Sequence, residues 1–428
     1  MIARALRVLK IKTPDIPPGF MQLIMHTGQA NQKSIVASTH FFITYHESHI
    51  SLIMENWALT SFVAFILSAF CAGILIPQIL LVAFRRNLFD EPAHRKIHHG
   101  IVPRLGGIAF TPVIFFTVSL LLGIEYSMGM DMNGLMAENA RAIAFGVCAI
   151  LLLYLTGMSD DLVGVRYRAK LVVQFICAAL LVAGGLWVSN LHGILGIYEI
   201  PFWLGAPLSM VIIVYVVNAI NLIDGIDGLA SGLSAAAFII YGTVFGLVGK
   251  PVYAVMSFAA LGVLVPFFYY NVFGNPVKRK KIFMGDTGSL TIGLLLTFMG
   301  LQILVYSPEQ VPLFGTNVIV MAVSPLIIPC FDVIRVFAFR LIHHGNPFLP
   351  DKSHIHHKLL AIGMPQKAAM VSIVIGAVFF SALNIFLSRY LNVNALLFID
   401  IFLWTAANYI INRLISKHKG VAQNNGNN

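Results

Sequence analysis

Charged residues are scarce in this chain of 428 residues, where Asp, Glu, Lys and Arg make up only 11% and hydrophobic residues 58%. A soluble domain usually carries about 25% charged residues, and no soluble core could bury this much apolar sequence. The apolar residues come in blocks of about 20, the length that a helix needs to cross a membrane. The composition therefore excludes a soluble protein and predicts an all-α, polytopic membrane protein.

Cysteine is also rare, and the four cysteines all lie inside apolar blocks. They are Cys71, Cys148, Cys177 and Cys330. Their spacing matches neither a metal site nor a disulfide framework, so we interpret them as small hydrophobic residues.

Eleven membrane-spanning helices are predicted from the apolar blocks. Their approximate ranges are 57–83, 105–123, 141–158, 169–189, 203–222, 228–248, 252–271, 287–306, 316–339, 367–388 and 394–414. An odd number of crossings puts the two ends of the chain on opposite sides. Five connecting loops then share one side with the C-terminus.

Lys and Arg are concentrated in these five loops and after the last span, while opposite loops such as 124–140 contain few of them. The residues are Arg85, Arg86, Arg95, Lys96, Arg166, Arg168, Lys170, Lys278, Arg279, Lys280, Lys281, Arg340, Lys352, Lys358, Lys417 and Lys419. The positive-inside rule predicts that this side is cytoplasmic and that the N-terminus is outside. We expect the membrane to be a plasma (inner) membrane. The net charge of +10 then reflects topology and contact with anionic lipid or substrate. It does not indicate binding to nucleic acid.

The two ends of the chain differ from its centre. Residues 1–54 form a mixed extension without the apolar core of a signal peptide, and Met54 is an alternative start of translation. We predict an integral membrane domain over residues 55–416 and a disordered cytoplasmic tail over 417–428.

Two adjacent carboxylates, Asp160 and Asp161, follow the third span. Adjacent carboxylates repel each other near a membrane unless a cation or solvent compensates them, so they suggest a cation site. A solvated helix end is the alternative. Lys170 begins the next span and is expected to return toward the same surface.

A second polar group, in the sequence NLIDGIDG, contains Asn221, Asp224 and Asp227 between very apolar segments. Gly225 and Gly228 suggest a broken helix end where the backbone approaches a ligand closely. A turn capped by the Asn and Asp side chains is the alternative, although it does not explain polar groups in such apolar surroundings.

A third group, FMGDTGS, places Asp286 between glycines at the start of a span. Exposed backbone N–H groups and a carboxylate suit an anion held through a divalent cation. An N-cap role for Asp286 is the alternative. The ring of Phe283 is a candidate for stacking on a base, or a buried boundary residue.

Oxygen ligands on separate loops favour Mg²⁺, with Mn²⁺ as the alternative. His354, His356 and His357 suggest zinc, but Lys, Ser and carboxylate neighbours favour contacts to phosphate or sugar hydroxyls. Asp332 is either a partner of a helix end or a member of the site.

In order, the motifs resemble those of the polyprenyl-phosphate N-acetylhexosamine-1-phosphate transferases. They are VPRLGG at 102–107, SDD at 159–161, NAINLIDGIDGLA at 218–230, FMGDTGS at 283–289 and DKSHIHHKLL at 351–360. The resemblance covers about 56–415. It implies transfer of HexNAc-1-phosphate, most simply GlcNAc-1-phosphate, from a UDP-sugar to undecaprenyl phosphate with release of UMP, which initiates cell-envelope polysaccharides. It also implies a homodimer.

The resemblance also implies roles for residues of this chain. Asp286 and Asn221 correspond to metal ligands, Asp160 to a base for the lipid phosphate supported by Asp161, and Lys170 to a diphosphate-binding lysine. Asp224 and Asp227 correspond to nucleoside contacts and Phe283 to a uracil-stacking ring. His354, His356 and His357 correspond to sugar-phosphate contacts.

The HIHH sequence is similar to the UDP-GlcNAc branch of the family, and Ile355 differs from the three histidines of the MurNAc-pentapeptide branch. The latter remains an alternative. A secondary transporter is the non-enzyme alternative, and it would place ionisable groups near the bilayer midplane rather than at helix ends. Because lipid phosphate is already anionic, we expect direct attack rather than an aspartyl-phosphate intermediate.

Overall fold

The computed structural model describes residues 32–88, 102–128, 132–305, 316–343 and 353–426. The chain divides into two compact units, Met1–Asn56 and Trp57–Asn428, and the functional motifs all belong to the second. The described residues are organised in helices, with one isolated β-bridge between Asn190 and Glu199. The all-α prediction is confirmed.

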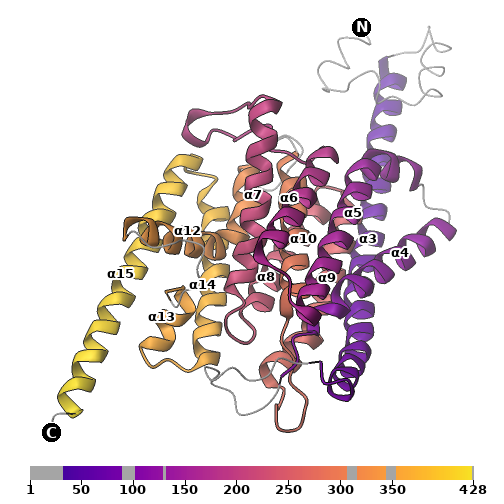
Figure 1. Cartoon of the computed structure of the whole chain (residues 1–428). Helices are drawn as coiled ribbons and strands as arrows, with labels where there is room; N and C mark the ends of the chain where they lie inside the picture. The colour runs from indigo at the N-terminus through magenta and orange to yellow at the C-terminus, as the bar shows by residue number, and fades with distance from the viewer. Residues whose placement is uncertain (1–31, 89–101, 129–131, 306–315, 344–352, 427–428) are drawn as a thin grey trace. The chain divides into compact units, whose positions relative to one another are not determined.

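The described part of the chain contains thirteen α-helices, most of which are labelled in Figure 1. They are α3 (Gln32–Arg85), α4 (Phe110–Ser127), α5 (Met132–Val163), α6 (Tyr167–Ala183), α7 (Phe202–Ile223), α8 (Leu229–Leu247), α9 (Pro251–Phe268), α10 (Gly285–Val305), α11 (Val318–Val323), α12 (Ile327–Ile342), α13 (Ile355–Ala361), α14 (Gln366–Leu387) and α15 (Val393–Gly426). A 3₁₀ turn, η2 (Gly106–Ala109), precedes α4, and a π-helical turn, η4 (Tyr269–Phe273), extends α9.

Ten helical segments of the described chain are long and apolar enough to cross a membrane, so the protein is a multi-pass membrane protein. They correspond to ten of the eleven predicted spans. The remaining prediction, 169–189, falls on α6, which has 17 residues and thus the minimum length for a crossing. Helix α6 packs between α5 and α7.

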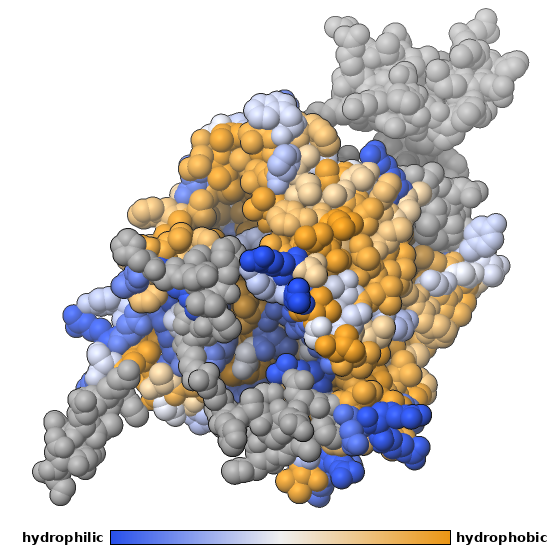
Figure 2. All heavy atoms as spheres, in the orientation of Figure 1, coloured by the Kyte–Doolittle hydropathy of each residue, from blue (hydrophilic) through white to orange (hydrophobic). Residues whose placement is uncertain are grey.

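Helix α10 forms the centre of the second unit and packs against α5, α7, α8 and α11. Nearly all its side chains are buried, as expected of a helix that is apolar on every face. Peripheral helices such as α15 instead expose large apolar side chains. Figure 2 shows apolar residues over much of the visible flank of this unit, which is the surface that lipid would cover.

The N-terminus of α10 is tightly enclosed. A Cβ atom on Gly157 of α5 would lie 2.6 Å from Cα of Thr287, and one on Gly107 would lie 2.0 Å from N of Gly288. Only glycine permits this approach of one backbone to another. These contacts fix where the first turn of α10 lies relative to α5.

The VPRLGG segment explains part of this enclosure. The backbone N–H of Phe283 donates to Pro103 O at 2.9 Å, and those of Gly106 and Gly107 donate to Phe283 O at 3.0 Å and Met284 O at 2.9 Å. The motif therefore supports the residues that lead into α10.

Two regions differ from the predictions. The predicted ninth span is interrupted by a 3₁₀ turn, η5 (Ser324–Leu326), and α12 changes direction after it (Figure 1). Helix α15 continues to Gly426, through most of the segment where we predicted a disordered tail.

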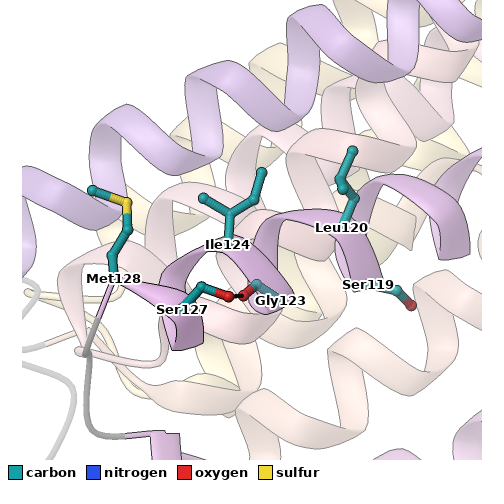
Figure 3. Close-up of a pocket in the computed structure, with 6 residues that line it drawn as sticks. All are labelled: Ser119, Leu120, Gly123, Ile124, Ser127 and Met128. Atoms are coloured by element: carbon teal, nitrogen blue, oxygen red, sulfur yellow. Dashed lines mark hydrogen bonds between the residues drawn. The ribbon is translucent and has the colours of Figure 1, made fainter.

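A shallow groove follows the outer surface of α4 near its C-terminal end (Figure 3). It is lined by Ser119, Leu120, Gly123, Ile124, Ser127 and Met128. The Ser127 hydroxyl donates to Gly123 O at 2.8 Å within the same helix. Because the lining has no titratable side chain, this groove is not a candidate for transfer chemistry.

Candidate active site

Four helix ends meet at one end of the second unit. They are the C-terminal ends of α5 and α7 and the N-terminal ends of α6 and α10, and each carries a predicted site residue. Loops far apart in the sequence therefore share one side, as the span count predicted. The ionisable groups lie at helix ends, which disfavours the transporter alternative.

Asp161 caps α10. Its Oδ1 accepts from the backbone N–H of Asp286 at 2.8 Å, and its Oδ2 accepts from both the N–H of Thr287 at 2.8 Å and the Thr287 hydroxyl at 2.5 Å. The two backbone N–H groups are among the donors that a helix leaves without intrahelical partners. The residue that caps the helix is thus Asp161 and not Asp286, so the Asp286 side chain is left to other partners.

Lys170 joins two carboxylates. Its Nζ lies 2.6 Å from Oδ2 of Asp286 and 3.1 Å from Oδ2 of Asp160. The other Asp160 oxygen accepts from the backbone N–H of Val165 at 2.7 Å. All three charged side chains are between about one sixth and one quarter exposed, so solvent and substrate can reach them.

Asn221 contacts the same carboxylate from α7. Its Nδ2 donates to Oδ1 of Asp286 at 3.3 Å and to the Ser289 hydroxyl at 2.8 Å. Rotation of the amide by 180° would turn Oδ1 toward Asp286 instead, which is the orientation that a metal ligand requires.

A pair of amides lies one helical turn away from the charged residues. Asn218 donates to Oε1 of Gln174 at 2.6 Å, and Gln174 donates back to Oδ1 of Asn218 at 3.4 Å. Gln174 is four residues after Lys170, and Asn218 is three residues before Asn221, so each pair lies on one helix face. The reciprocal contact therefore holds α6 and α7 in the register that the site needs.

The acidic residues fit a divalent cation. One oxygen each from Asp160, Asp161 and Asp286 lies within 4.8 Å of the others, and Lys170 contributes one positive charge against three carboxylates. Oxygen donors with excess negative charge suit Mg²⁺ or Mn²⁺. Within the described residues, this group of possible ligands contains no histidine.

The segment between α7 and α8 carries Asp224 and Asp227. Burial, reinforced by repulsion from Asp227, Asp286 and Asp161, raises the pKa of Asp224 from 3.8 to about 7. Asp227 instead pairs with the buried Lys281 at 2.5 Å. The Nζ atom of Lys281 also lies 5.9 Å from the ring centroid of Phe283, and the Phe283 ring is partly exposed.

The backbone around Gly228 is fixed by a second amide. Gly228 has a φ of +80° and donates its N–H to Oδ1 of Asn271 at 2.6 Å, while Asn271 donates to Ile282 O at 2.9 Å. One side chain therefore ties the segment that carries Asp227 to the segment that leads to Phe283.

The HIHH residues reach this region from α13. His356 is buried and lies so close to Gly225 that a Cβ atom there would be 2.1 Å from its Nε2. Neither His356 ring nitrogen has a hydrogen-bond partner among the described residues. Burial, with repulsion from His357, lowers the pKa of His356 to about 3, so this ring is neutral. The Asp332 carboxylate holds the neighbouring His354.

The structure brings five of the predicted site residues into direct contact, namely Asp160, Asp161, Lys170, Asn221 and Asp286. Asp224 and Asp227 are close enough to repel each other, and Phe283 lies beside Lys281. His356 reaches Gly225 and lies next to the rings of His354 and His357.

Sequence reasoning did not assign Lys281, Asn271, Gln174 and Arg335 to the site. Lys281 belongs to a run of basic residues that we explained only by membrane topology. The other three have no local motif, and only contacts across the bundle show their positions. Lys352 lies outside the described residues.

Comparison with known proteins identifies relatives of the chain. Residues 143–304 match the family described as glycosyl transferase family 4. A Bacillus subtilis protein named probable undecaprenyl-phosphate N-acetylglucosaminyl 1-phosphate transferase is 31% identical over 326 residues, which are 74% of this chain and 82% of the relative.

Two enterobacterial relatives are both named undecaprenyl-phosphate alpha-N-acetylglucosaminyl 1-phosphate transferase. The Escherichia coli K12 protein is 28% identical and the Salmonella typhi protein 29% identical, in each case over 71% of this chain and 77% of the relative. The motifs, the cluster of carboxylates at the helix ends and the extent of these matches agree: the chain belongs to glycosyl transferase family 4.

Proposed function

We propose that the protein transfers N-acetylglucosamine-1-phosphate from UDP-N-acetylglucosamine to undecaprenyl phosphate and releases UMP. The observation that carries the proposal is the meeting of Asp160, Lys170, Asn221 and Asp286 at one group of helix ends. Relatives with names of this activity align with most of the chain.

The proposed reaction is a direct displacement. An oxygen of the lipid phosphate attacks the phosphorus that carries the sugar, a new P–O–P bond forms, and the bond to the bridging oxygen of UMP breaks. The oxygen that leaves with UMP takes the electron pair. The attacking oxygen already carries negative charge, so a base has less to remove than from a hydroxyl nucleophile.

Lys170 and the carboxylates have different electrostatic roles in the proposed reaction. Lys170, between Asp160 and Asp286, supplies a cation that attracts the anionic phosphates. Asp286 and Asn221 would hold a divalent metal, and transferases of this family generally depend on one. When bound, Mg²⁺ or Mn²⁺ would offset the negative charge on the diphosphate as UMP leaves. Asp161 orients Asp286 through its backbone N–H.

The remaining residues suit recognition of the UDP-sugar. Phe283 offers a partly exposed ring on which a base can stack. Asp224 and Asp227 lie on the adjacent segment for contacts with the nucleoside. The histidine segment lies against the same segment at Gly225, where it suits contacts with the sugar or its phosphate.

The basic residues place this end of the bundle at the cytoplasmic face in our proposal, because Lys and Arg remain on the side from which a membrane protein is inserted. Cytoplasmic UDP-sugars would then reach the site directly, while the lipid phosphate arrives from the membrane boundary. A bacterial inner (plasma) membrane holds the lipid phosphate and borders the cytoplasm that supplies the UDP-sugar.

The test uses purified protein with Mg²⁺, undecaprenyl phosphate and a panel of UDP-sugars, with UMP release as the readout. We expect UMP from UDP-N-acetylglucosamine only when the lipid phosphate and the metal are both present. Release from no UDP-sugar would refute the proposed reaction. Release only from UDP-MurNAc-pentapeptide would move the chain to the alternative branch.

A further inference from the structure

The side chain of Asp332 contacts both His354 and Ile355 at the start of the histidine segment. Its side chain is fully buried in α12. Oδ1 accepts from Nη2 of Arg335 at 2.8 Å and from the backbone N–H of Ile355 at 3.0 Å, while Oδ2 lies 2.8 Å from Nδ1 of His354. One carboxylate therefore binds both the backbone and a ring of the predicted substrate loop.

Arg335 completes the arrangement. The same Nη2 atom that contacts Asp332 also donates to Ser353 O. We call Asp332 and Arg335 together the histidine clamp. The clamp holds three consecutive residues, by the carbonyl of Ser353, the ring of His354 and the amide of Ile355. Helix α13 has only seven residues, too few to be stable alone, so its start depends on such contacts.

The clamp also determines which nitrogen of His354 carries a proton. A carboxylate can only accept hydrogen bonds, so Nδ1 of His354 must be the donor to Oδ2 of Asp332. In the neutral ring Nε2 is then an acceptor. An acceptor pairs with a hydroxyl or amide N–H of a sugar, and it does not pair with an ionised phosphate oxygen.

The placement of the loop connects this ring with the site. The His354 and His356 rings are parallel, with an interplanar angle of 4° and centroids 5.8 Å apart. His356 in turn lies against Gly225 of the segment that carries Asp224. Through these contacts, a displacement of His354 would be passed to the loop between α7 and α8.

We propose that Asp332 is a positioning residue that fixes His354 as the Nδ1-protonated tautomer, so that Nε2 accepts a hydrogen bond from a hydroxyl or N-acetyl N–H of the sugar. This inference rests on the proposed function. In this proposal His354 contacts the sugar and not the diphosphate. The histidine clamp, which positions His354, therefore contributes to recognition of the sugar.

Asp332→Asn is the informative variant. Two donors face Oδ1 and one faces Oδ2, so the amide oxygen of Asn is expected to remain toward Arg335 and Ile355. Its NH₂ group then faces Nδ1 of His354 and forces the opposite tautomer, with Nε2 protonated. We expect kcat/KM for UDP-N-acetylglucosamine to fall about 10- to 100-fold, as for other groups that orient a histidine. The KM for undecaprenyl phosphate should be unchanged.

A double-mutant cycle separates positioning from a merely structural effect. If Asp332 acts through His354, the Asp332→Asn substitution should cause no further loss in a His354→Ala background. Independent losses that multiply in the double variant would overturn the proposal. Asp400→Asn is the matched control, because Asp400 is a buried carboxylate paired with Asn384 in other helices, and it should leave kcat/KM unchanged.

A spectroscopic readout tests the tautomer without turnover. In protein labelled with ¹⁵N-histidine, the His354 signals are those lost in His354→Gln. We expect a protonated Nδ1 in the wild-type protein and a protonated Nε2 in Asp332→Asn, and the reverse in the wild type would refute the proposal. A wild-type protein that released no UMP would refute the proposed function alone, because the spectra test the tautomer independently.

Discussion

A Cβ atom on Gly225 would lie 2.1 Å from Nε2 of His356. Gly225 follows α7, and His356 belongs to α13, more than a hundred residues later. The contact leaves no space for a side chain at position 225, and it joins the acidic segment after α7 to the histidine segment. The NLIDGIDG and HIHH motifs therefore lie directly against each other.

Gly225→Ala should displace His356 or the backbone of its own loop, since 2.1 Å is far below any real Cβ contact. We expect a loss in kcat/KM of roughly 100-fold, the effect of misplacing a site by about 1 Å. UMP release under steady-state conditions measures it. Gly246→Ala is the control, because a Cβ at position 246 meets nothing within 4 Å. Equal activities of the two variants would contradict the prediction.

Asp161→Ala should lower both stability and activity. It removes the acceptor for the N–H groups of Asp286 and Thr287, and loss of a helix cap costs about 1–2 kcal/mol. Asp160→Ala removes one bond to Val165 and one to Lys170, so its main effect should be on kcat. Thermal denaturation in detergent together with UMP release distinguishes the two. A larger fall in melting temperature for Asp160→Ala would argue against the capping role.

Asp286→Ala should abolish most of the activity, and the activity that remains should no longer depend on Mg²⁺. Asp286 shares Lys170 with Asp160 and contacts Asn221, so its loss removes the carboxylate on which these side chains converge. Titration of Mn²⁺ by its paramagnetic signal measures binding separately from turnover. Full Mg²⁺-dependent activity of the variant would refute the metal assignment.

The pH dependence of stability should report Asp224. Its pKa is raised to about 7 in the folded protein, against 3.8 as the ordinary value. The folded state therefore binds a proton that the unfolded chain has lost, and this stabilisation declines as pH rises from about 4 to about 7. Above pH 7 the loss is complete.

Asp224→Asn removes this titration, so in metal-free buffer the variant should gain stability relative to the wild type as pH rises over that range. Melting temperatures measured with EDTA between about pH 5 and pH 8 provide the comparison. Parallel curves for the two proteins would show that Asp224 does not titrate there. A divalent cation should narrow the difference, because it favours the ionised carboxylate.

The Gln174 and Asn218 pair should be energetically coupled. Gln174→Leu removes the donor to Oδ1 of Asn218, while Nδ2 of this part-buried amide keeps its bond to Val214 O, and the loss of one such hydrogen bond costs about 1 kcal/mol. Gln174→Leu/Asn218→Leu removes both partners and should cost less than the sum of the two single changes. Thermal unfolding of the four proteins tests this, and strictly additive losses would contradict the coupling.

The apolar blocks of the sequence determined the helical class and most of the membrane spans. Their number and the positions of Lys and Arg also determined that the acidic and histidine loops lie on one side of the membrane. Both features can be predicted because hydrophobic length and charge bias act locally along the chain. The motifs also named Asp160, Lys170, Asn221 and Asp286 as neighbours. In the structure Lys170 contacts Asp160 and Asp286, and Asn221 contacts Asp286.

Only the tertiary structure decided which partner each group takes. Asp161, rather than Asp286, caps α10, and Asp332 holds His354 although 22 residues separate them. The break at η5 turns α12 within an apolar stretch that reads as one continuous span. Such contacts depend on how helices approach one another through glycines such as Gly157 and Gly107. How closely two helices approach depends on the shapes of both packed surfaces, so the residue pattern along one helix does not predict it.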